Sequence, residues 1–137
     1  MRYFSVTLLR ATLMAALLGV FISVSAAGPL EDAEAAYQAG NYPSALRLFQ
    51  LLANQGNAQA QHNVGVIYAN GRGVPQDYIL AHMWFNLAAS QGDADAAEAR
   101  EQVAKSMSPT QVAEAQKMAR EWKPKSDGPA KKRIPNR

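Results

Sequence analysis

Two histidines, His62 and His82, are the side chains of this 137-residue chain best suited to metal binding or proton transfer. They do not form a His-Glu-x-x-His pair, and the sequence has no cysteine to complete a zinc site. No Ser-x-x-Lys pairing occurs, so a serine nucleophile with a neighbouring lysine base is also missing. We therefore predict no catalytic residue, no metal site and no cofactor. We expect His62 to be a polar residue that faces a groove and His82 to be solvated on a helix surface.

The segments that carry these histidines belong to an internal repeat. Gln55-Gly56-Asn57-Ala58 returns as Gln91-Gly92-Asp93-Ala94, an offset of 36 residues. Further upstream, Tyr37 pairs with Tyr68 at an offset of 31, so the second copy has a five-residue insertion in its turn. A period in the thirties with helix-compatible composition indicates stacked helical hairpins. The sequence thus predicts an all-α fold, an α/α solenoid of about six helices.

Residues 1–27 have the pattern of an export signal. Arg2 and Arg10 precede an apolar run, which ends at the small residues Val24-Ser25-Ala26-Ala27. We expect cleavage after Ala26 or Ala27 and a mature protein that is periplasmic or secreted, where a chain without cysteine must rely on packing alone. The alternative is an uncleaved membrane anchor.

Charge divides the remaining chain into two parts. Residues 28–122 contain six basic and ten acidic side chains, whereas residues 123–137 contain six basic side chains and one acid, Asp127. The acidic part has enough apolar residues for a single core. We therefore predict a repeat domain over residues 28–122 and a basic disordered tail over residues 123–137.

The junctions between helices have recognisable signals. Gly56 and Gly92 can each end a helix, and the Asn57 or Asp93 that follows can cap the next one. In the longer turn of residues 71–75 we expect Pro75 to lie at the entrance of the fourth helix.

The third predicted helix, residues 58–70, has two distinct sides. Its apolar side is formed by Ala60, Val64, Ile67 and Tyr68. The opposite side mixes polar groups with one apolar residue, which is typical of an exposed peptide groove. The predicted partner-binding residues are Gln59, His62, Asn63, Val66 and Asn70.

Residues 68–78, Tyr-Ala-Asn-Gly-Arg-Gly-Val-Pro-Gln-Asp-Tyr, followed by Ala81, Trp84 and Gly92, resemble the Sel1-like repeat family, which is related to tetratricopeptide repeats. The resemblance is most complete over residues 58–92, while residues 33–56 resemble a shorter variant. It implies a solenoid that serves as an adaptor for other proteins or peptides, with no family-wide catalytic residues.

Two hypotheses of function follow. In the first, the protein is a non-catalytic interaction adaptor of the bacterial cell envelope, which binds a protein or peptide partner in the groove. In the alternative, the basic tail docks on anionic lipid or polysaccharide and the solenoid only presents it. A solvated tail without any docking role is the third interpretation of the same charges. We expect a monomer and, after export, no nucleic-acid partner.

Overall fold

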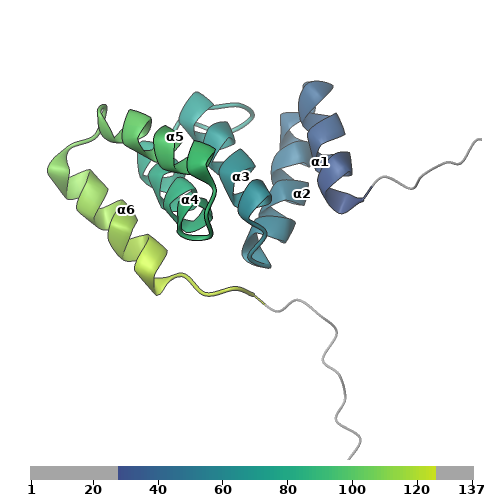
Figure 1. Cartoon of the computed structure of the whole chain (residues 1–137). Helices are drawn as coiled ribbons and strands as arrows, with labels where there is room; N and C mark the ends of the chain where they lie inside the picture. Colours follow the sequence, from purple (N-terminus) through teal and green to yellow (C-terminus); the bar gives the residue numbers. More distant parts are fainter. Residues whose placement is uncertain (1–27, 126–137) are drawn as a thin grey trace, which may run out of the picture.

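The computed structural model describes residues 28–125, and over this range it contains six α-helices and no strand (Figure 1). The prediction of an all-α helical-hairpin solenoid is confirmed. The predicted signal peptide and residues 126–137 of the predicted tail lie outside the described residues. The helices are α1 (Pro29–Gln38), α2 (Tyr42–Asn54), α3 (Ala58–Asn70), α4 (Tyr78–Ser90), α5 (Ala94–Ala104) and α6 (Pro109–Glu121).

From α1 to α5 each helix packs against the next one along the chain, and α6 then packs on α4 (Figure 1). Trp84 of α4 and Trp122, just after α6, meet edge to face with 6.3 Å between the ring centroids. Aromatic pairs favour this geometry because the positive edge of one ring faces the negative face of the other. The last helix is therefore held at α4, in the middle of the stack.

The two junctions predicted from the repeat have the same structure. Gly56 and Gly92 adopt left-handed backbone conformations, with φ of 96° and 98°, which a residue without Cβ accepts at little cost. Asn57 then accepts a hydrogen bond from the Ala60 amide at 2.8 Å, and Asp93 accepts one from the Ala96 amide at 2.9 Å. Each cap satisfies an amide that has no partner inside its helix.

The longer turn between α3 and α4 reaches back to the first hairpin. The Arg72 guanidinium donates to the Tyr42 hydroxyl at 2.6 Å and lies 5.4 Å from the centre of that ring. The expected position of Pro75 at the helix entrance is wrong, because α4 begins at Tyr78 with Asp77 as its cap. The five residues inserted in the second copy of the repeat extend this turn across Tyr42 before α4 starts.

Helix α4 is the centre of the core because it is buried on two sides. Met83, Trp84 and Leu87 belong to a cluster shared with α1, α2, α3 and α6. Ala81, Phe85 and Ala88 belong to a second cluster with α5. A helix that is apolar almost all round is expected only where neighbours cover most of its surface.

Candidate functional site

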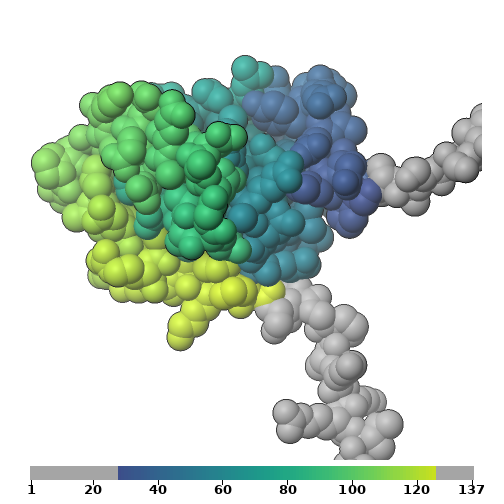
Figure 2. Space-filling model, in the orientation of Figure 1, coloured from purple at the N-terminus to yellow at the C-terminus, as the bar shows by residue number. Residues whose placement is uncertain are grey.

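Helices α1 and α3, which begin the first two hairpins, and α5, which packs on α4, border an open hollow of about 440 Å³. Figure 2 shows the surfaces of these helices following one another from blue through teal to green on one face of the molecule. We call this site the α1–α3–α5 hollow. It is lined by Glu34, Tyr37, Gln38, Phe49, Gln59, His62, Asn63, Asp93 and Asp95.

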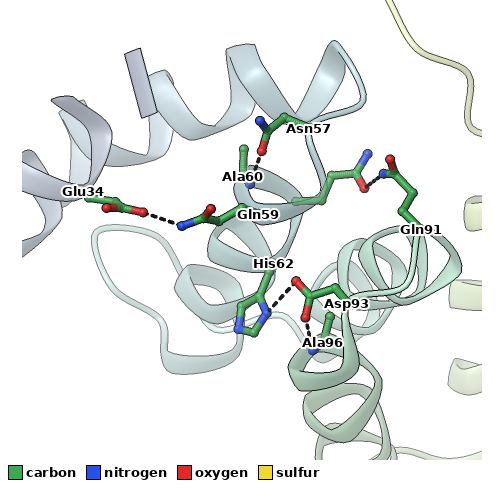
Figure 3. A network of polar contacts seen from close by, with 9 residues as sticks. Glu34, Asn57, Gln59, Ala60, His62, Gln91, Asp93 and Ala96 are labelled. Atoms are coloured by element: carbon green, nitrogen blue, oxygen red, sulfur yellow. Dashed lines mark hydrogen bonds and ion pairs between the residues drawn. The ribbon is translucent and has the colours of Figure 1, made fainter. Parts of the chain in front are cut away.

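Hydrogen bonds join the three walls of the hollow (Figure 3). The Gln59 amide of α3 donates to the Glu34 carboxylate of α1 at 2.7 Å. Across α3, the Nδ1 of His62 lies 3.3 Å from the Asp93 carboxylate, which at the same time caps α5. The His62 ring also meets Phe85 edge to face, with 5.7 Å between centroids. These contacts fix the relative positions of the walls.

The hollow is acidic. Glu34, Asp93 and Asp95 line it, and in the part of the chain that the structure describes no lysine or arginine does. Within residues 28–125, His62 is the only group with a basic nitrogen within 4.0 Å of one of these three carboxylates. Carboxylates that lack an opposite charge attract cationic groups from solution. The electrostatics of the site therefore favour a positively charged ligand.

The structure brings together three of the five predicted binding residues. Gln59, His62 and Asn63 line the α1–α3–α5 hollow. Val66 instead packs, half-buried, against the core cluster around Phe85. Asn70 borders a different, smaller hollow between α3 and α5.

Reasoning from the sequence missed the acidic walls. Asp95 has the same place in the second junction as Gln59 in the first, at the repeat offset of 36, so the repeat alignment could have identified it. Glu34 gives no comparable signal. Its contribution depends on how α1 packs beside α3.

The predicted environment of His82 is wrong. His82 is buried rather than solvated, with 3% of its surface exposed, and its Nδ1 has no hydrogen-bond partner. Burial, together with the positive charge of Arg100, lowers its pKa, while Glu101 acts in the opposite direction. In the described part of the chain, no group of three or more His, Cys, Asp or Glu side chains is placed to hold a metal ion.

Comparison with family models decides the family. The Sel1 repeat model matches the chain twice, over residues 33–57 and 58–93. The chain contains two Sel1 repeats. The shorter first match agrees with the shorter first copy expected from the sequence, and the two matches cover the α1–α2 and α3–α4 hairpins of the Sel1-like fold. None of the curated proteins searched matches this Sel1-like chain significantly.

Sel1 repeats are generally protein–protein interaction modules, and Sel1-repeat proteins are typically non-catalytic adaptors. The α1–α3–α5 hollow lies where the first helices of these repeats meet α5. None of the helices within residues 28–125 has the length and apolar character needed to cross a membrane.

Proposed function

We propose that this Sel1-like protein is a non-catalytic adaptor of the bacterial cell envelope, which binds a segment of a partner protein in the α1–α3–α5 hollow. The observation that carries the proposal is the hollow itself, an open polar site with walls from α1, α3 and α5. Its amides, carboxylates and imidazole offer the hydrogen-bonding groups that recognise a polypeptide. The export signal of residues 1–27 supports the envelope location.

The contacts inside the site suit recognition better than catalysis. His62 and Asp93 form a pair, but Asp93 is committed to capping α5. Among the described residues, no serine, threonine or cysteine lines the hollow to act as a nucleophile beside them. A rigid wall of hydrogen-bonding groups remains, which binds a ligand without transforming it.

The experiment is crosslinked capture of partners from intact cells, with variants of the hollow. Gln59→Ala combined with Asn63→Ala removes two polar groups from the wall, and neither residue belongs to the buried core. We expect recovery of the partner to fall roughly tenfold, because two lost hydrogen bonds weaken binding by about 1–3 kcal/mol.

The matched control is Asn70→Ala with Gln116→Ala, which removes two amides of the same kind outside the hollow. Equal capture by the hollow variant and the control would refute the adaptor proposal. Loss of capture on deletion of residues 126–137 alone would favour the surface-binding alternative.

A further inference from the structure

Residues 28–125 place no lysine or arginine in the hollow, whereas the chain has a cationic segment beyond them. Residues 126–137 contain four basic side chains, Lys131, Lys132, Arg133 and Arg137, and a single acid, Asp127. By contrast, three carboxylates line the hollow, those of Glu34, Asp93 and Asp95. The two regions are complementary in charge.

The described chain ends close to this site. After α6, the Lys125 amide donates to the carbonyl of Asn54 at 2.7 Å, at the end of α2 and just before the turn that leads into α3. Trp122 and Pro124 border a small hollow with Gly56 and Gln61, at the beginning of the same helix. The segment that follows is therefore anchored at the end of α3 that carries Gln59 and His62.

The remaining length is sufficient to reach the carboxylates. The six residues from Ser126 to Lys131 span up to about 20 Å when extended. Following the surface of α3 from one side to the other covers about half its circumference, roughly 16–19 Å for a helix about 10–12 Å in diameter. Lys131 and the three basic residues after it can thus reach the hollow while Lys125 stays on Asn54.

We propose that residues 126–137 of this same chain bind in the α1–α3–α5 hollow as a tethered competitor of the partner. The inference rests on the proposed function of the hollow as a peptide-binding site. A short tether gives the segment an effective concentration in the millimolar range, so a weak ionic interaction is enough to fill the site. A partner then has to displace the segment, and high salt favours its release by screening the charges.

The first test uses the full mature chain and a carbodiimide, which joins a lysine amine to a carboxylate in direct contact with it. Mass spectrometry of the monomer should find Lys131 or Lys132 linked to Asp95 or Glu34. Glu114, an exposed carboxylate on α6, is the control. We expect links to the hollow to exceed links to Glu114 and to disappear in about 1 M salt, where the screening length is about 3 Å.

Two results would overturn the proposal. Links to Glu114 as frequent as those to Asp95 and Glu34 would mean that the segment has no preferred site. In a mixture of isotopically labelled and unlabelled chains, links found only between different chains would assign the hollow to a second copy.

The second test measures binding of a synthetic peptide with the sequence of residues 126–137. The variant Lys131→Glu with Lys132→Glu should bind this peptide roughly tenfold more tightly than the wild-type chain, because its own segment no longer competes. Adding Glu34→Gln and Asp95→Asn should abolish that binding. Equal affinity of the wild-type chain and the tail variant would contradict the proposal.

The two tests separate this inference from the proposed function. If the peptide does not bind but Gln59→Ala with Asn63→Ala still loses the cellular partner, self-occupancy is wrong and the adaptor function stands. If the peptide binds and partner capture does not depend on the hollow, self-occupancy stands and the adaptor site is wrong.

Discussion

Helices α2 and α4 have the same place in the two Sel1 repeats, yet α4 has seven buried residues and α2 has four. Pairs of residues separated by the repeat offset of 36 show why more side chains are buried in α4. Phe49 and Phe85 are both buried, whereas Leu51 is 48% exposed and its counterpart Leu87 only 9%. Leu87 lies beside Trp122 and Pro124, which the chain places there after α6. The repeat thus determines the shared core positions, and the neighbours of each hairpin determine the rest.

The exposed face of α2 can be compared with the equivalent face of α4 in the same way. Arg47 of α2 is exposed, while its counterpart Met83 is 6% exposed and belongs to the main core cluster. An internal helix needs apolar residues on several sides because neighbours cover them. A helix with fewer neighbours keeps charged residues at the equivalent positions.

The largest expected effect on the free energy of unfolding comes from comparing Trp84 of α4 with Leu48, which has the equivalent position in α2. Trp84→Ala removes a buried indole that packs on Trp122 and should lower the free energy of unfolding by about 3–5 kcal/mol. Leu48→Ala, at the same place in α2, removes a half-buried side chain and should cost about 1 kcal/mol. Denaturant midpoints measure both values. Equal midpoints would mean that the two repeats contribute equally to the core.

A second prediction concerns the close approach of α3 to α4. A Cβ added at Gly65 would lie 2.6 Å from the Phe85 ring, which is itself only 2% exposed. Gly65→Ala should therefore destabilise the protein by about 1–3 kcal/mol, even though alanine favours helix by about 1 kcal/mol over glycine. At the equivalent position the first repeat has Glu34, whose side chain lines the hollow. A stabilised Gly65→Ala variant in thermal unfolding would show that the ring moves aside freely.

A third prediction compares the two junction caps. Asn57→Ala loses one hydrogen bond to the helix amides and should cost about 1 kcal/mol. Asp93→Ala loses the equivalent bond and also its contact with His62, so we expect a cost closer to 2 kcal/mol. Asp93→Asn, which keeps a capping oxygen, is the control. If Asp93→Ala and Asn57→Ala show the same melting temperature, the contact with His62 does not contribute to stability.

The sequence predicts what depends on local chemistry. The glycine and Asx residues of the junctions repeat visibly, and these side chains set the helix ends by themselves. The serine cap of α6 is of the same kind, since Ser108 and Gln111 complete a capping box within four consecutive residues.

What the sequence does not predict depends on contacts between distant segments. Gln61 is fully buried because it donates to the Ala53 carbonyl and accepts from Gln91, a residue of the next junction. Glu34 becomes part of the hollow only through the packing of α1 beside α3. The sequence places Val66 on the polar side of α3, opposite its apolar stripe, and therefore predicts it in the groove, whereas both sides of this helix meet neighbours.

The smallest expected effect tests the buried histidine against its counterpart, since the first repeat has Leu46 where the second has His82. His82→Leu removes a buried Nδ1 without a partner and should raise the free energy of unfolding by about 1 kcal/mol at pH 7.5. The pKa of His82 in the folded protein is lowered, chiefly by burial, from an ordinary value of 6.5. Below that pH the unfolded chain binds a proton that the folded protein resists, so wild-type stability decreases as the pH falls from about 6.5 toward the folded pKa.

The increase in the free energy of unfolding of His82→Leu over the wild-type protein should therefore be larger at pH 5.0 than at pH 7.5. Urea unfolding at the two pH values measures this difference, and His62 does not affect it because both proteins contain that residue. An advantage that is the same at both pH values would mean that His82 takes up its proton as readily in the folded protein as in the unfolded chain. The second repeat would then tolerate a charge in its core at the position where the first repeat has leucine.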